Sequence, residues 1–390
     1  MNFVLLSPNF PPGYYRFGEA LKNMGAHVFG VGEMNYDSLS YPQKKALSEY
    51  YRVDSLHDYD QVLRALGYFT YRYGKLDQID SFNEYWLGLE ARLRRDFNIE
   101  GLIPTDLNCV QKKSCMKKIF ARAGVASASG GVFDRYEDAK VFALENGFPL
   151  IAKPDSGVGA SDTFRIEDMQ ALEQFFCSAQ RQHTGYFLET FINGSLESFD
   201  GLTNQNGQIV FYTSHVFCRG IMDIVNQDLD MFYYSRRDVP EALRLAGEKI
   251  VAELNLRGRF FHIEFFRTTQ DNFVALEINL RPPGGLTVDM FDYAFDFDVF
   301  FQWAEISMYN RFKANTVPLY HVCYVGRKNR YHYSISHDEV LKLAGASLVQ
   351  HEAISPVLST AIGDYGYIVR GRNLDDVTRL AELILQKEDR

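Results

Sequence analysis

The sequence has few cysteines, and their spacing excludes two ways of cross-linking a small domain. There are five, an odd number, and no two of them are spaced C-x-x-C: Cys109, Cys115, Cys177, Cys218 and Cys323. A disulfide framework needs paired cysteines, and a structural zinc site usually needs closely spaced ones. We therefore expect reduced thiols and a cytoplasmic protein.

Long apolar runs and an excess of positive charge are also missing. No apolar segment approaches the ~20 residues that span a bilayer, and the short run 3–6 lacks the basic start and the length of a signal peptide. The 41 Lys and Arg residues against 50 Asp and Glu residues give a net charge of −9, which disfavours a nucleic-acid partner. We expect a soluble protein that acts on small molecules, with neither a membrane nor a nucleic acid as its partner.

Two familiar phosphate-binding motifs are absent as well. The turn after the first predicted strand, residues 7–13, is not G-x-G-x-x-G, and no G-x-x-x-x-G-K-S/T loop occurs. The chain does have Lys153 near the end of the apolar strand 148–154, followed at once by a Gly/Ser-rich turn over 155–161. The backbone N–H groups of such a turn and a lysine ammonium suit a polyphosphate, although the turn can equally be a plain connection.

The length and the apolar content predict a chain of two or three lobes, since 390 residues with 46% hydrophobic side chains exceed one typical core. Apolar periodicity predicts a β-α-β start over 2–32, helices over 82–96, 111–123, 136–146, 169–179 and 240–254, strands over 101–104, 148–154 and 185–192, and a hairpin over 198–212. Residues 35–80 give no readable pattern, and 213–237 is interpreted as a loop that suits a substrate. The tail predicts strands near 321–325 and 366–370 and a final helix capped by Asn373. Together these elements indicate an α/β chain.

Two consecutive predicted strands, 260–266 and 272–281, carry polar residues where core strands would be apolar. Side chains alternate between faces, so His262 shares a face with Glu264, and Glu277 shares one with Asn279 and Arg281. The polar segment 267–271 joins the strands as a hairpin, and cross-strand pairing then brings Glu264 and Glu277 together. Two neighbouring carboxylates raise each other's pKa unless a cation lies between them.

A hard divalent cation would relieve this repulsion. Mg²⁺ prefers oxygen ligands and is usually held by one or two carboxylates together with substrate phosphates, a set that Glu264, Glu277 and Asn279 begin to supply. Arg281 adds a planar donor for a phosphoryl or carboxylate group, and the pair Gly284-Gly285 lets backbone approach a ligand closely. The alternative interpretation is a solvated edge hairpin with a surface ion pair.

The order of these motifs resembles that of the ATP-grasp superfamily of ligases. Lysines at 113 and 153, the glycine turn, the segment 189–197 and the two carboxylate strands follow one another in the family's order, and 277–285 resembles its magnesium-binding strand. The resemblance implies an N-terminal α/β lobe over 1–106, followed by two α+β lobes that sandwich ATP. These are a small subdomain over 107–185 and a large one over 186–312, with a C-terminal α+β extension over 313–390.

The resemblance also assigns roles to individual residues. Lys113 and Lys153 would contact the ATP phosphates, although the adjacent Lys112 could take the place of Lys113. The remaining nucleotide contacts would come from a closing loop with Ser156, Gly157, Gly159 and Ser161, from a linker with Glu189, Thr190, Phe191 and Ile192 that binds adenine, and from Glu197 at the ribose. Glu264, Glu277 and Asn279 would coordinate Mg²⁺, and Arg281 and Lys153 would be catalytic. Arg281, Gly284, Gly285 and His215 are candidates for substrate contact, with a structural role for His215 as the alternative.

The activity implied by the resemblance is ATP-dependent joining of a carboxylate to an amine through an acylphosphate, with release of ADP and phosphate. The implied cofactors are ATP and two Mg²⁺ ions, for which Mn²⁺ could substitute. Three alternatives stay open: a bicarbonate-phosphorylating ligase of the biotin-carboxylase or carbamoyl-phosphate type, a non-catalytic nucleotide-binding protein, and a kinase of the same fold. A homodimer is the commonest oligomeric state and is our expectation here.

Overall fold

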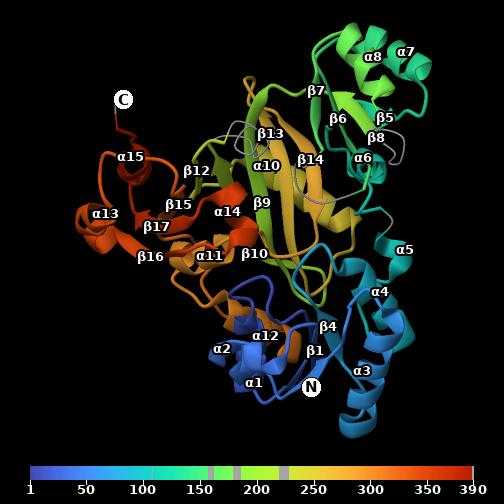
Figure 1. Ribbon diagram of the computed structural model, residues 1–390, viewed down its shortest axis with the longest axis vertical. Helices are drawn as coiled ribbons and strands as arrows, with labels where there is room; N and C mark the ends of the chain where they lie inside the picture. Colours follow the sequence, from blue (N-terminus) through green and yellow to red (C-terminus); the bar gives the residue numbers. More distant parts are fainter. Residues whose placement is uncertain (108, 157–161, 179–185, 219–227, 389–390) are drawn as a thin grey trace.

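The protein is described by a computed structural model that covers residues 1–107, 109–156, 162–178, 186–218 and 228–388. Its described strands form three sheets, of four, nine and four strands, which define an N-terminal, a large and a small lobe (Figure 1). In Figure 1 the large sheet lies in the centre, with the N-terminal lobe below it and the small lobe at the top right. None of the described helices is long and apolar enough to cross a membrane.

The N-terminal lobe is a parallel sheet in the order β3-β2-β1-β4. Its strands are β1 (Asn2–Leu6), β2 (His27–Gly32), β3 (Glu49–Arg52) and β4 (Gln78–Asp80), and its helices are α1 (Tyr15–Asn23), η1 (Tyr36–Ser38), α2 (Tyr41–Ala46), α3 (Tyr59–Tyr73) and α4 (Leu87–Asp96). The predicted β-α-β start is confirmed. Over 35–80 the helices begin at polar caps, because Ser40 forms a capping box with Gln43 at α2 and Asp58 accepts a backbone N–H bond from Gln61 at α3.

The small lobe is an antiparallel sheet in the order β5-β8-β6-β7. Its strands are β5 (Gly130–Val132), β6 (Leu150–Pro154), β7 (Phe164–Ile166) and β8 (Tyr186–Thr190), and the nearby helices are α5 (Pro104–Leu107), α6 (Lys113–Arg122), α7 (Tyr136–Asn146) and α8 (Met169–Cys177). Helix α6 ends before Gly124, whose φ of +65° is the conformation that favours glycine after a helix. The three helices predicted over 111–179 are therefore confirmed.

The large lobe is built on the sheet β14-β13-β9-β11-β12-β15-β17-β16, with β10 paired to β9. The strands are β9 (Gly194–Thr203), β10 (Ile209–Thr213), β11 (His215–Phe217), β12 (Met231–Ser235), β13 (Phe260–Thr268), β14 (Phe273–Asn279), β15 (His321–Arg327), β16 (Leu348–Ala353) and β17 (Tyr365–Gly371). The helices are α10 (Glu241–Glu253), α11 (Thr287–Phe295), α12 (Val299–Tyr309), α13 (His337–Ala344), η3 (Gly345–Ser347), α14 (Pro356–Ile362) and α15 (Leu374–Leu385). Asn373 caps α15 as predicted, by accepting from the backbone N–H of Asp375.

Two secondary-structure predictions are wrong. Residues 101–104 form no strand, because Pro104 instead begins α5 and the Asp106 carboxylate accepts the Ile103 N–H at 2.9 Å, as at a helix start. The segment 213–237 is not simply a loop, since it contains β11 and β12. The three residues of β11 are too few to show an alternating pattern.

The sheets also distribute the chain differently from the predicted lobe boundaries. The boundary at 185/186 separates β8 from the small sheet with which it pairs. The predicted extension 313–390 contributes β15, β16 and β17 to the same sheet that carries the carboxylate hairpin. The C-terminal part is therefore continuous with the large lobe.

A buried cluster of charges fixes the N-terminal lobe against the carboxylate hairpin. Arg259, which directly precedes β13, lies 3.1 Å from Asp80 and 3.3 Å from Glu90, and Arg94 lies 2.8 Å from Glu90. Glu90 is fully buried. An unpaired charge in such a place is costly, so these pairs hold the two lobes in one arrangement.

Candidate active site

The hairpin of β13 and β14 places Glu264 directly opposite Glu277, and His262 directly opposite Asn279. This is the register that the alternating sequence predicted. The pairing shifts after Glu264, so the ladder is irregular beside the two carboxylates. Irregular pairing of this kind is common next to functional sites, because it redirects a side chain.

The two carboxylates have the electrostatics of a cation site. Burial raises the pKa of Glu277, and the adjacent Glu264 raises it further, while Lys113, Lys153 and Arg281 oppose the shift. The Lys113 Nζ atom lies 3.9 Å from Glu277 Oε1. A divalent cation between the carboxylates would keep both ionised.

The donor set fits a cation that shares its ligands with a substrate. Over the described residues, no group of three or more His, Cys, Asp or Glu side chains could enclose a metal ion. Glu264, Glu277 and the Asn279 amide supply two carboxylates and one neutral oxygen, which leaves positions for phosphate oxygens and water. Mg²⁺ is commonly held in this way.

Behind Glu264 lies a buried row of polar groups in which sequence analysis identified His262 and His215 but missed Asp200. His262 contacts Asp200 through Nδ1, and its Nε2 lies 3.2 Å from Glu264 Oε1. Burial alone would lower the pKa of His262, but Asp200 and Glu264 raise it to about 9, so both ring nitrogens donate. The imidazolium thus orients Glu264, as a carboxylate's supporting partner does in many metal sites.

His215, predicted as a substrate contact, belongs to the same row. It is fully buried, and its Nδ1 lies 2.7 Å from Asp200 Oδ2. Among the described contacts it supports Asp200, and through Asp200 it supports His262. We therefore place His215 behind the site, in the structural role that the sequence left as the alternative.

Glu189 joins two lysines on the small lobe. Its Oε1 lies 2.6 Å from Lys153 Nζ, and its Oε2 lies 2.8 Å from Lys117 Nζ. Burial would raise the pKa of Glu189, but the two ammonium groups hold it below its usual value. Lys117 was not predicted, although its position four residues after Lys113 places both on one face of α6.

Lys113, rather than Lys112, faces the carboxylates. Lys113 is buried at the start of α6 and Lys112 is exposed. The start of this helix is held by Asp155, which accepts from Lys113 N at 2.8 Å and from Ser114 N at 2.8 Å. Ser156 pairs with Lys112 as an isolated bridge. The predicted loop residues Gly157, Gly159 and Ser161 lie outside the described residues.

The predicted linker 189–192 begins within β8, which contains Glu189 and Thr190, and Phe191 and Ile192 then lead from the small sheet to β9 of the large one. Thr190 N donates to Ser129 O at 2.9 Å, and Phe191 N donates to Pro149 O at 3.2 Å. Ile192 is half-buried between β8 and β9.

Glu197, the candidate for the ribose, is fully buried on β9. Its Oε1 accepts from Arg236 at 2.9 Å and from Arg267 at 3.2 Å. Its Oε2 is enclosed without a hydrogen bond from any described residue. One oxygen is therefore committed to the two arginines and the other has an unused acceptor capacity.

Arg281 follows the carboxylate strand and lies where the N-terminal lobe meets it. Its Nη1 donates to Pro282 O at 2.9 Å, and its Nε lies 3.9 Å from Glu84 Oε2. Tyr14 of the N-terminal lobe donates to Pro283 O at 2.7 Å, which fixes the backbone beyond Arg281. The Asn83 side chain accepts from the Trp86 N–H at 3.1 Å just before α4.

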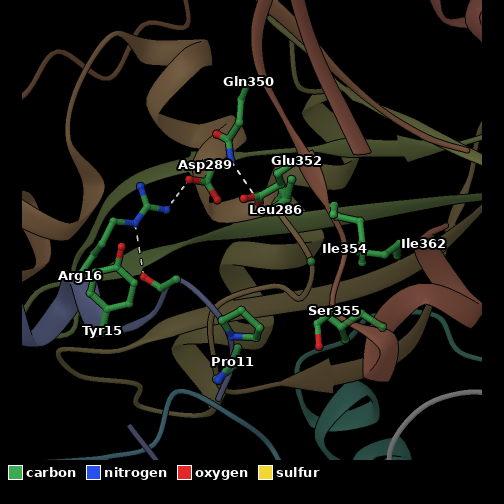
Figure 2. A pocket seen from close by; sticks show the side chains of 15 residues that line it. Pro11, Tyr15, Arg16, Leu286, Asp289, Gln350, Glu352, Ile354, Ser355 and Ile362 are labelled. Atoms are coloured by element: carbon green, nitrogen blue, oxygen red, sulfur yellow. Dashed lines mark hydrogen bonds and ion pairs between the residues drawn. The ribbon is translucent and has the colours of Figure 1, made fainter. Parts of the chain in front are cut away.

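A cavity of about 370 Å³ opens beside Gly285 (Figure 2). Three separate segments line it: 11–16 of the N-terminal lobe, 285–289 after the carboxylate strand, and 350–362 near the C-terminus. Arg16 forms an ion pair with Asp289 across one side, and Gln350 and Glu352 lie near them in Figure 2. Of the predicted site residues that the structure describes, only Gly285 lines the cavity; Gly284 is adjacent in sequence.

Comparisons with known proteins agree on the fold. No protein-family model matches the chain. The L-arginine-specific L-amino acid ligase of Bacillus subtilis is 24% identical over 267 residues, which are 66% of this chain and 64% of that protein. The match therefore covers slightly less than two thirds of the relative's length.

Solved structures match over nearly the whole chain. The L-amino acid ligase from Bacillus licheniformis has a TM-score of 0.75 at 14% identity and covers 98% of this chain and 96% of its own. The biotin carboxylase domain of 2-oxoglutarate carboxylase from Hydrogenobacter thermophilus, solved with MgADP, ADP and bicarbonate, has a TM-score of 0.73 at 16% identity, covering 98% and 89%. Phosphoribosylglycinamide synthetase from Anaerococcus prevotii has a TM-score of 0.71 at 14% identity, covering 98% and 97%. The chain thus has the ATP-grasp fold that its motif order predicted.

Proposed function

We propose that this protein is an ATP- and Mg²⁺-dependent ligase that joins a carboxylate to an amine. The carboxylate is activated as an acylphosphate, and the amine displaces phosphate to form an amide bond, with ADP and phosphate as the other products. The observation that carries the proposal is the pairing of Glu264 with Glu277 beside Lys113, with Arg281 just beyond the end of β14. The names of the similar ligases support this reaction class.

The site contains what phosphoryl transfer needs, which is positioning and neutralisation of charge rather than covalent chemistry. Lys113 and Lys153 bind the phosphates, and Arg281 stabilises the charge that develops on the transferred group. Glu264, Glu277 and Asn279 would hold Mg²⁺, which supplies charge neutralisation at the phosphate oxygens. We assign two Mg²⁺ ions to the site and expect Mn²⁺ to replace them.

The nucleotide is proposed to lie between the small and large sheets. The linker 189–192 is proposed to contact the adenine, and Glu189 also positions Lys153. The unused Oε2 of Glu197 is the acceptor that we assign to a ribose hydroxyl. The loop with Ser156, Gly157, Gly159 and Ser161 is proposed to cover the phosphates, which protects an acylphosphate from water.

Amino acids are the substrates that we propose, with the cavity beside Gly285 receiving one of them. Its walls combine the apolar side chains Leu286, Ile354, Leu358 and Ile362 with the charged groups Arg16, Asp289 and Glu352. A pocket with apolar walls and a few polar groups is typical of small-molecule sites. We further propose that the ligase is a cytoplasmic homodimer.

The test is release of ADP and phosphate from MgATP across a panel of amino acids and small carboxylic acids, singly and in pairs, with products identified by mass spectrometry. We expect release that needs both a carboxylate and an amine, and a product one water lighter than their sum. Release with bicarbonate alone would favour the bicarbonate-phosphorylating alternative, and a phosphorylated product without an amide would indicate a kinase. ATP binding without release under any condition would contradict the ligase.

A further inference from the structure

Glu84 is a buried carboxylate of the N-terminal lobe that the reaction described above does not use. Its side chain is 9% exposed, and Oε2 accepts no hydrogen bond from any described residue. Among the described residues it forms an ion pair with Arg281, whose Nε lies 3.9 Å from Oε2. At this distance the two groups attract each other as ions, but they are too far apart to form a hydrogen bond.

The charged groups that face Glu84 do not satisfy it. They are Arg281, Arg259, Glu277 and Glu90. Arg259 already donates to Leu280 O at 2.7 Å and contacts Asp80 and Glu90, and Arg281 donates to Pro282 O. Glu277 and Glu90 repel a second negative charge. An enclosed carboxylate oxygen without a donor is costly and is seldom kept for stability alone.

We propose that Glu84 is a catalytic base that binds the ammonium group of the amine substrate beside Arg281 and removes its proton. This inference rests on the proposed ligase function. An ammonium group supplies the hydrogen-bond donors that Glu84 Oε2 lacks. Its place next to Arg281 brings the nitrogen close to the group that would stabilise the reacting acylphosphate.

The proton balance of the step is complete. The substrate R–NH₃⁺ gives one proton to the Glu84 carboxylate, and the neutral nitrogen lone pair forms a bond to the acyl carbon. The C–O bond to phosphate then breaks, and the second nitrogen proton leaves with the phosphate, giving the amide and HPO₄²⁻. The proton on Glu84 passes to solvent before the next turnover.

The basicity of Glu84 suits this role. Burial raises the pKa of Glu84 to about 7, with Arg281 and Arg259 opposing the shift and Glu277 and Glu90 adding to it. A general base is most effective when its pKa lies near the working pH. Glu264 and Glu277 are assigned to Mg²⁺, and Glu90 is paired with Arg94, so Glu84 is the described carboxylate near Arg281 that is left for proton transfer.

The test compares two nucleophiles in the Glu84→Gln variant. Hydroxylamine is largely unprotonated at neutral pH and traps an acylphosphate as a hydroxamate without a base. We expect Glu84→Gln to lower kcat/KM for the amino-acid amine by about 10²-fold or more, while hydroxamate formation from the carboxylate, ATP and hydroxylamine changes by less than about threefold. Glu84→Asp should restore part of the amine reaction, and kcat/KM of the parent should fall below about pH 7.

Glu305→Gln is the matched control. Glu305 of α12 is also a buried glutamate with an oxygen that accepts no described hydrogen bond, and its Oε2 lies 3.4 Å from both Arg311 Nε and Lys313 Nζ. Glu305→Gln should leave both the amine reaction and hydroxamate formation unchanged.

Equal losses with both nucleophiles would overturn the inference, because Glu84 would then act by positioning Arg281. Unchanged amine coupling in Glu84→Gln would overturn it too. If the parent forms neither hydroxamate nor amide with any carboxylate, the proposed function itself fails, and this inference fails with it.

Discussion

At the scale of single residues, Glu277 is the side chain on which the cation site depends. It is opposed by Glu264 across the hairpin and lies near Lys113. We expect Glu277→Ala to lower ADP release at least about 10³-fold at saturating Mg²⁺, because charge neutralisation at the phosphates is lost. The thermal midpoint should not decrease, since the substitution removes a buried like-charge repulsion. Glu145→Ala, at an exposed position of α7, is the control. Undiminished ADP release in Glu277→Ala would remove it from the site.

Lys153 is proposed to act on the nucleotide rather than on the fold. We expect Lys153→Ala to weaken ATP binding about tenfold or more in titration calorimetry, since a buried ammonium group near the phosphates is lost. Glu189 keeps Lys117 as a partner, so the small lobe should remain folded. Lys118→Ala, exposed on α6, should bind ATP as the parent does. Equal affinity in Lys153→Ala and parent would contradict the assignment.

Asp292 gives a prediction about pH. Burial raises the pKa of Asp292 to about 8, partly opposed by the Val299 N–H that it accepts at 2.7 Å. A raised carboxyl pKa favours the folded state when the group is protonated, so its contribution is present below the ordinary value of 3.8 and is lost as pH rises through about 8. Asp292→Asn keeps the acceptor oxygen. Its thermal midpoint should decrease less than that of the parent between about pH 5 and pH 9, and parallel decreases would show that Asp292 is not responsible.

At the scale of elements, the buried ion pairs around Arg259 should contribute more to the free energy of unfolding than the same number of exposed ion pairs. Arg259→Ala leaves Glu90 and Asp80 with fewer partners in a buried place, so we expect a loss of about 3–5 kcal/mol in the free energy of unfolding, measured with denaturant. Arg244→Ala removes two ion pairs from an exposed helix face and should have little effect. Similar small losses in both variants would mean that the cluster does not hold the lobes together.

The sequence predicted the carboxylate hairpin because polar residues interrupted an otherwise apolar alternation, and strand pairing has a fixed period. It did not predict α11 and α12, whose buried apolar residues occur on most sides and so show no polar face to mark a helix. Within 35–80, short elements such as α2 depend on their caps, but the 15-residue helix α3 buries Val62, Ala65, Leu66 and Phe69 at helical spacing, so its signal was present and was missed. Lys117 could have been predicted, because it lies four residues after Lys113 on α6. The contact of Glu84 with Arg281 could not, because the two residues are distant in sequence and leave no local pattern.

At the scale of the whole molecule, the cavity beside Gly285 could not be predicted from any local sequence pattern. Its walls come from three segments that are far apart in the sequence: 11–16, 285–289 and 350–362. We expect Ile354→Trp to fill part of the cavity and to raise KM for one amino-acid substrate at least about tenfold, with ATP affinity unchanged. Val357→Trp, at an exposed position of α14 that does not line the cavity, is the control. An unchanged KM for every substrate in Ile354→Trp would place the substrates elsewhere.

The large sheet also constrains when the parts of this protein can fold during synthesis. β12 pairs with β15 and β15 pairs with β17, so the sheet that carries Glu264 and Glu277 includes strands as late as residue 371. Contacts between residues far apart in sequence form after local ones, because the intervening chain must first be ordered. Even the N-terminal lobe depends on a later segment, because Phe3 and Phe17 pack against Trp303 of α12. The cavity beside Gly285 needs residues 350–362 as well, so an unfinished chain that lacks them has no such pocket.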